Sequence, residues 1–307
     1  MMLKRRTILA GTLAAVALVG AAQAQNGERL RAWLAAQQGG SAGPQVPAGE
    51  TIAYGRDPLQ TLSVWRAPGN GPAPLVLFVH GGGWQRGDKD NATGRWKAVH
   101  YREAGYAFAS INYRLVPAAT VEQQATDVAM ALKALLDRAD RLGLDRRRVV
   151  LMGHSAGAHL VALVGTDERY LKTAGLSFAD VAGIIPIDGA AYDVPAQLQQ
   201  AGPRMAQTYG QAFGSDPARQ RALSPTAQAA APNAPAFLLL HVQRPDGVTQ
   251  NHALATALLA AHTAVDVVSI PGEGLMGHME INRRLGDPDY AGTAPVDRWL
   301  HARFAGR

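Results

Sequence analysis

Apolar and polar positions along the chain follow two periodicities, one typical of buried strands and one typical of helices. Apolar runs of strand length occupy 61–65, 74–80, 106–111, 148–152, 183–187, 236–242 and 265–270. The runs at 74–80 and 106–111 are almost continuously apolar, which is typical of strands buried on both faces. Helical periodicity fills intervals at 120–142, 252–262 and 296–304. Strands that alternate with helices predict an α/β fold with a doubly wound, mostly parallel sheet flanked by helices.

Three segments stand apart from this alternation. Residues 1–24 have the composition of a leader, and residues 25–50, rich in Ala, Gly, Gln and Pro, are expected to form an N-terminal arm. Residues 51–307 are then one large domain. Within it, 192–232 is the longest interval between predicted strands, with a helix-like part at 203–213, and is expected to be a small cap-like insertion.

The leader carries Lys4-Arg5-Arg6, an apolar run over 8–19 and Ala22-Gln23-Ala24. A basic start, a short apolar stretch and a small-x-small site predict an export signal peptide, cut before Gln25, of the Sec or twin-arginine type. The protein is then periplasmic or secreted. The alternative is a membrane anchor, but the run is short for a span, so we expect no stable membrane insertion after cleavage.

Charge and cysteine content exclude several classes. The formal charge is +6, but without residues 1–24 there are 27 Lys and Arg against 24 Asp and Glu, which gives +3. This small excess, with no dense basic run, gives no reason to expect a nucleic-acid partner. The chain has no cysteine, and no two His or acidic residues stand at ligand spacing, so neither a metal nor a cofactor is expected.

The strongest chemical pattern is Gly153-His154-Ser155-Ala156-Gly157, between the run at 148–152 and a helical stretch. A nucleophile elbow needs a G-x-S-x-G turn from strand to helix, because the strained serine is lifted clear of the sheet and close packing demands glycine beside it. Ser155 is therefore the candidate nucleophile. The alternative is a glycine-rich turn whose serine only caps the helix.

A second pattern, His80-Gly81-Gly82-Gly83-Trp84, follows directly on the run at 74–80. Glycines at these positions let backbone N–H groups approach an oxyanion closely. The amides of Gly82, Gly83 and Ala156 are the predicted oxyanion hole, and the alternative is a tight loop without a ligand. Trp84 and His154 are candidates for lining the substrate pocket, with a packed core tryptophan as the other interpretation of Trp84.

A serine nucleophile needs a histidine base and an orienting carboxylate. Of nine histidines, His278 lies in a glycine-containing segment after the run at 265–270, where we expect a loop that can carry an imidazole over the elbow. The predicted carboxylate is Asp246, in a Pro-Asp-Gly turn after the run at 236–242, and Asp188 and Asp193 are the alternatives. The order Ser155, Asp246, His278 is that of α/β-hydrolases.

On these residues the chain resembles α/β-hydrolase carboxylesterases, in particular the hormone-sensitive-lipase-like and arylformamidase-like groups. The resemblance rests on His80-Gly81-Gly82-Gly83-Trp84, the segment 111–115 (Ile-Asn-Tyr-Arg-Leu), Gly153-His154-Ser155-Ala156-Gly157 and the His278 segment. It covers about residues 50–305, departs from the groups at the segment 244–246, and implies hydrolysis of small acyl esters or formyl amides without a cofactor.

The resulting hypothesis is a serine carboxylesterase that hydrolyses short-chain or aryl esters of small molecules through an acyl-enzyme. One alternative is an arylformamidase-like amide hydrolase. Another, of a different class, is a non-catalytic binding protein that keeps the fold and the pocket.

Overall fold

A computed structural model describes residues 43–69 and 71–306. The predicted leader and most of the predicted arm lie outside the described residues. Gln45–Arg307 form one compact unit by their internal contacts. The strands are β1 (Glu50–Ala53), β2 (Thr61–Trp65), β3 (Ala73–Val79), β4 (Ala107–Ile111), β5 (Leu144–His154), β6 (Gly183–Ile187), β7 (Ala236–Gln243) and β8 (Ala264–Glu273).

The helices fall into those between the strands and those of the insertion. The first group is α2 (Trp96–Glu103), α3 (Val121–Leu136), α4 (Ala139–Leu142), α5 (Ala156–Thr166), α6 (Arg169–Thr173), η1 (Phe178–Asp180), α11 (Pro245–Ala260), α12 (Gly274–Arg284) and α13 (Thr293–Ala305). The insertion holds α7 (Val194–Gln200), α8 (Pro203–Phe213), α9 (Pro217–Ala222) and α10 (Pro225–Gln228).

The strands form one eight-stranded sheet in the order β1-β2-β4-β3-β5-β6-β7-β8. The pairs β1–β2 and β2–β4 are antiparallel, and every pair from β4 to β8 is parallel. The predicted α/β-hydrolase type of sheet, mostly parallel and covered by helices, is therefore confirmed. The four-residue strand β1 escaped prediction, because three of its residues are exposed and carry no apolar pattern.

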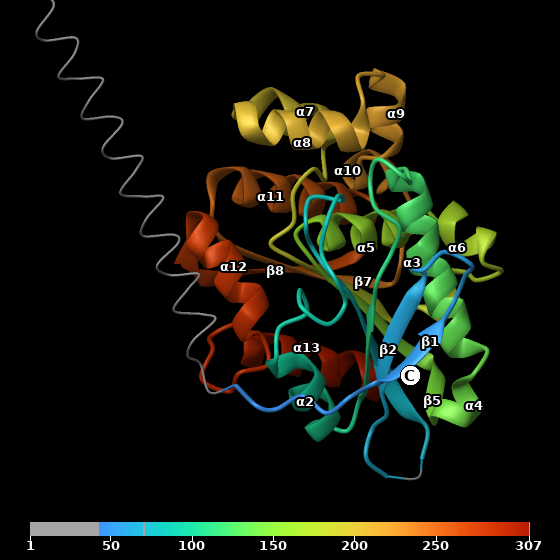
Figure 1. Cartoon of the computed structure of the whole chain (residues 1–307). Helices are drawn as coiled ribbons and strands as arrows, with labels where there is room; N and C mark the ends of the chain where they lie inside the picture. The colour runs from blue at the N-terminus through green and yellow to red at the C-terminus, as the bar shows by residue number, and fades with distance from the viewer. Residues whose placement is uncertain (1–42, 70, 307) are drawn as a thin grey trace, which may run out of the picture. The chain divides into compact units, whose positions relative to one another are not determined.

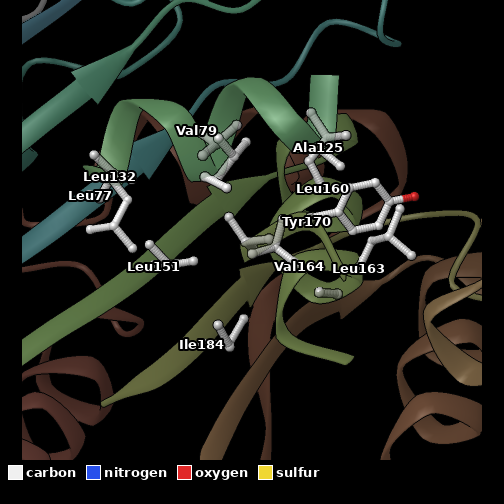
Figure 2. Close-up of a cluster of buried hydrophobic side chains, with 14 of the residues drawn as sticks. Leu77, Val79, Ala125, Leu132, Leu151, Leu160, Leu163, Val164, Tyr170 and Ile184 are labelled. Atoms are coloured by element: carbon white, nitrogen blue, oxygen red, sulfur yellow. The ribbon is translucent and has the colours of Figure 1, made fainter. Parts of the chain in front are cut away.

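Alternate residues of the central strands enter two cores, one on each face of the sheet. In β3, Leu75, Leu77 and Val79 face the core under α3, α5 and α6, whereas Val76 and Phe78 face the one under α2 and α13. Figure 2 shows part of the first core, with Leu77 and Leu151 of the sheet against Leu132, Leu160 and Tyr170 of the helices. Burial on both faces explains why β3 is continuously apolar.

The chain order places one switch point in this sheet. From β3 the chain passes through α2 to β4 on one side, and then returns through α3 to β5 on the other. Open α/β sheets bind ligands beyond the carboxyl ends of the strands at such a point. The loop after β3 and the turn after β5, which carry the two glycine motifs, meet there.

Two of the predicted helical stretches can be compared with the structure. The stretch predicted at 120–142 forms α3, which begins at a capping box of Thr120 and Gln123 and ends at Leu136, and a separate α4 follows. The insertion helix predicted at 203–213 coincides with α8. In Figure 1 the gold helices α7, α8 and α9 lie together above α11 and α5. No helix among residues 43–69 and 71–306 is long and apolar enough to cross a membrane.

Candidate active site

Ser155 stands at the tip of the turn between β5 and α5. Its φ of 56° and ψ of −118° form a strained conformation that aims the side chain away from the sheet. A Cβ at Gly153 would collide with the carbonyl of Gly157, and one at Gly157 with the carbonyl of Val79. Because strand, turn and helix pass this close, the glycines at both positions are a packing requirement, and the geometry is that of a nucleophile elbow.

His278 lies within hydrogen-bond distance of Ser155. Its Nε2 is 3.1 Å from Ser155 Oγ, so the hydroxyl can donate to the ring, and its Nδ1 is 2.5 Å from Asp188 Oδ2. The three side chains thus form a continuous chain of hydrogen bonds. His278 does not lie on a loop as predicted. It lies in the first half of α12, because β8 extends to Glu273 and the helix begins at the next residue.

The carboxylate that contacts His278 is Asp188, and the prediction of Asp246 is wrong in this respect. Asp188 follows directly on β6, the strand that pairs with the elbow strand β5. Asp246 lies in the first turn of α11 rather than in an open Pro-Asp-Gly turn, and its Oδ2 is 2.6 Å from Arg244 Nη1. Asp193, the other alternative, caps α7 by accepting from the amide of Ala196.

Asp188 is held in the orientation that His278 requires. It is fully buried, its φ is 43°, and its Oδ1 accepts from the amide of Val242 at 3.2 Å. Burial alone would raise the pKa of Asp188. The hydrogen bond from His278 and the charge of Arg244 outweigh that cost and hold the pKa below its ordinary value. Asp188 is therefore an anion at neutral pH.

The backbone amides of Gly82, Gly83 and Ala156, in the glycine loop and at the start of α5, have no hydrogen-bond acceptor among the described residues. A Cβ at Gly81 would lie 2.9 Å from the Cβ of Ser155, so the glycine loop packs directly on the serine. Gly82 has φ 128° and Gly83 φ 62°, values that L side chains rarely adopt.

The ring of His80 holds the glycine loop through a hydrogen bond and a stacking contact. Its Nδ1 donates to the carbonyl of Gly81 at 2.7 Å, and it stacks on Tyr113 with the ring centroids 4.4 Å apart. Tyr113 Oη in turn donates to the carbonyl of His80 at 2.9 Å. Burial lowers the pKa of His80, so the ring is neutral and can serve as a fixed support.

The segment 111–115 anchors the other end of the loop. Asn112 Oδ1 accepts from the amide of Lys89 at 2.6 Å, while Arg114 forms a bidentate ion pair with the buried Asp127 of α3. A bidentate pair of this kind fixes orientation as well as charge. These contacts give the Asn-Tyr-Arg pattern of 112–114 a structural role, which the sequence alone did not indicate.

Neither predicted pocket residue faces an open pocket. Trp84 is 1% exposed and packs edge-on against His159 and Phe213 in the core. His154 is 4% exposed, its ring centroid is 4.5 Å from that of His278, and its Nε2 donates to the carbonyl of His278 at 2.9 Å. Burial, and then the proximity of His278, lower the pKa of His154 far below its ordinary value, so a neutral ring supports His278.

Lys97 supports α12 in a way that the sequence did not reveal. Its fully buried ammonium donates to the carbonyl of Thr93 at 2.8 Å and to the carbonyl and the side chain of Asn282. Asn282 lies one turn after His278 on the same helix. Burial lowers the pKa of Lys97 to about 7. The contact ties α12, and with it His278, to α2.

The insertion closes over the glycine loop. A Cβ at Gly83 would lie 3.0 Å from the methyl of Thr208 in α8, and Gln85 Nε2 donates to the carbonyl of Thr208 at 3.4 Å. Beside it lies a groove of about 420 Å³, lined by Met205 and Tyr209 of α8 and by Asp246. Within the described parts of the chain, no cluster of three or more His or acidic side chains could hold a metal ion.

An elbow serine, a histidine and a buried carboxylate at the carboxyl edge of a mostly parallel sheet define an α/β-hydrolase. The BD-FAE family model matches residues 65–258, and the chain belongs to that family.

Curated relatives include esterase LipC of Mycobacterium tuberculosis, 35% identical over 124 residues, which are 39% of this chain and 30% of LipC. The isoprenylcysteine α-carbonyl methylesterase ICME of Arabidopsis thaliana is 34% identical over 130 residues, which are 42% of this chain and 30% of ICME. The matched segment thus spans under a third of these relatives' length.

Solved structures match over nearly the whole chain. Esterase B of Lactobacillus rhamnosis has a TM-score of 0.72 at 24% identity, covering 97% of both chains. An inhibited form of that esterase has a TM-score of 0.72 at 25% identity, covering 95% of this chain and 96% of the other. A truncated carbohydrate esterase from gut microbiota has a TM-score of 0.71 at 18% identity, covering 86% of this chain and 99% of the other. These likenesses confirm the fold.

Proposed function

We propose that the chain is a serine carboxylesterase that hydrolyses short-chain or aryl esters of small molecules. The observation that carries the proposal is the hydrogen-bonded series Ser155–His278–Asp188. The amides of Gly82, Gly83 and Ala156, which no described acceptor occupies, support it as oxyanion donors. Relatives named as esterases, and an esterase structure with a bound inhibitor, support the same chemistry.

In the first half-reaction Ser155 Oγ attacks the ester carbonyl carbon while His278 Nε2 takes the hydroxyl proton. The negative charge that develops on the carbonyl oxygen is stabilised by the amides of Gly82, Gly83 and Ala156. Asp188 holds the ring with Nδ1 protonated and stabilises the imidazolium that forms. The bond to the alcohol oxygen then breaks, and the alcohol leaves with the proton from His278.

In the second half-reaction a water molecule takes the place of the alcohol. His278 removes a proton from the water as it attacks the acyl carbon, and the same amides stabilise the second oxyanion. The bond to Ser155 Oγ breaks, the acid leaves, and the serine regains its proton. No cofactor is required in either half.

A series of p-nitrophenyl esters from acetate to decanoate tests this proposal. We expect turnover of the short members that falls as the acyl chain lengthens, because α8 packs closely over the glycine loop. Ser155→Ala protein, purified in parallel, measures the activity of contaminating esterases, which is then subtracted. An aryl formamide, assayed beside the acetate ester, distinguishes an esterase from an arylformamidase-like amide hydrolase. A preference for the formyl over the acetyl substrate would favour the amide hydrolase. A folded protein without turnover of either would favour a binding protein.

We also propose that the protein is exported and works in the periplasm or outside the cell. The support is Lys4-Arg5-Arg6, the apolar run over 8–19 and the small-x-small site that ends at Ala24. Expression of the whole chain in a bacterial host is expected to give a periplasmic or secreted protein whose first residue is Gln25. Protein that stays in the cytoplasm and begins at Met1 would contradict export.

A further inference from the structure

Arg244, between β7 and α11, lies between two carboxylates, one of which contacts His278. Its Nε is 3.3 Å from Asp188 Oδ2 and its Nη1 is 2.6 Å from Asp246 Oδ2. The remaining Nη2 donates to the carbonyls of Asp188 and Gly189, at 3.3 and 3.0 Å. The guanidinium thus contacts both the side chain and the backbone of the residue that orients the base.

The arrangement is buried on the side of Asp188 and open on the side of Asp246. The side chain of Asp188 is fully buried, that of Arg244 is 16% exposed and that of Asp246 is 29% exposed. Gln197 of α7 donates to Asp246 Oδ2 at 3.3 Å and fixes it from the insertion. A charge so close to a buried ion pair is little screened by solvent.

We propose that Arg244 is a positioning residue that sets the pH range in which His278 acts as a base, and that Asp246 moderates this effect by partly neutralising Arg244. The inference rests on the proposed function, because it concerns the base of that reaction. Asp246, the acid predicted for the triad, then acts on His278 only indirectly, through Arg244 and Asp188.

The sign of the effect follows from the charges. The cation of Arg244 disfavours a second cation on His278, and it also competes with His278 for Asp188 Oδ2. Both effects favour the neutral ring, which is the form that accepts the proton of Ser155. The anion of Asp246 offsets part of the positive charge. Removing the two groups should therefore move the pH dependence in opposite directions.

Other ionisable groups surround His278 and stay in place in every variant. His154 packs against its ring, Lys97 of α2 acts on His154, and Glu280 lies on the same helix. Tyr192, just before α7, and Tyr290, in the segment after α12, interact electrostatically with Asp188. Because these groups are common to the variants, a shift between variants reports on the group that was changed.

The test is the pH dependence of kcat/KM for p-nitrophenyl acetate, followed by titration of the acid released. In Arg244→Met we expect the midpoint of the acidic limb to move to higher pH by about one unit. Arg244→Lys retains the charge and should keep the midpoint near that of the unchanged chain. A loss of plateau activity that is equal in both variants, with no shift of the midpoint, would assign Arg244 a structural role only and overturn the proposal.

Asp246→Asn should shift the midpoint in the opposite direction, and it tests the proposal even if Arg244→Met fails to fold. The amide keeps an oxygen for Arg244 Nη1 but removes the charge, so the midpoint should move to lower pH by about half a unit. A shift to higher pH, or none, would contradict the proposal. Failure of the proposed function itself would look different, since the unchanged chain would then hydrolyse no ester at any pH.

Discussion

Asp188→Asn is expected to lower kcat for a short acyl ester about 10⁴-fold, the loss that the same change causes in serine proteases with the same order of hydrogen bonds. An asparagine fits the space, but its amide can donate to His278 Nδ1 and so favours the tautomer with Nε2 protonated. That tautomer cannot take the proton of Ser155. The measurement is kcat for p-nitrophenyl acetate at the plateau of the pH profile.

Asp246→Asn is the matched control for this prediction. Asp246 contacts Arg244 and Gln197 but not His278, so the plateau kcat should stay within about tenfold of the unchanged chain. The reverse pattern, with Asp246→Asn severely impaired and Asp188→Asn active, would restore Asp246 as the orienting acid. It would also mean that the segment after β7 rearranges when substrate binds.

Ser155→Ala is expected to lower kcat by about 10⁵- to 10⁶-fold, a loss comparable to that of removing the nucleophile of a serine protease. The residual rate would come from water attacking an ester that the amides of Gly82, Gly83 and Ala156 still polarise. Because alanine fits the same small space at the tip of the turn, the fold should be retained. The measurement is kcat for p-nitrophenyl acetate, with thermal unfolding and circular dichroism to establish that the variant is folded. Activity within tenfold of the unchanged chain would remove Ser155 from the mechanism.

The two glycine motifs were predictable because their requirements are local. Gly153 and Gly157 are needed where a strand, a turn and a helix pack without room for a Cβ, and Gly82 and Gly83 where the backbone adopts positive φ. A single sequence records such demands directly. The parallel sheet could be predicted for a similar reason, since strands such as β3 and the second half of β5 are continuously buried and largely apolar.

The triad carboxylate could not be chosen in this way, because the choice depends on which strands are neighbours. Asp188 and Asp246 both follow apolar runs of strand type, and both precede a glycine. The strand order shows that Asp188 follows β6, the neighbour of the elbow strand, whereas Asp246 follows β7, one strand further away, and forms an ion pair with Arg244. Chain order alone favoured the later aspartate.

The supports of His278 were missed for the same physical reason. Lys97 and His154 act through contacts with Asn282 and with the carbonyl of His278, which are 185 and 124 residues away in the chain. In the sequence Lys97 has the features of a surface helix residue. The sequence around His278 was itself misleading. The Gly-Leu-Met-Gly segment 274–277 favours a loop, but in the structure it is the first turn of α12.

The most direct test of the central claim, that Ser155 is the nucleophile of an acyl-transfer site, is covalent labelling. The chain is incubated with a fluorophosphonate, digested, and its adduct is located by mass spectrometry. We predict one phosphonylated residue, Ser155, with loss of ester hydrolysis in proportion to labelling, and no adduct at that position in Ser155→Ala. An adduct on another residue that abolishes activity, or full hydrolysis by a chain that takes up no label, would contradict the account.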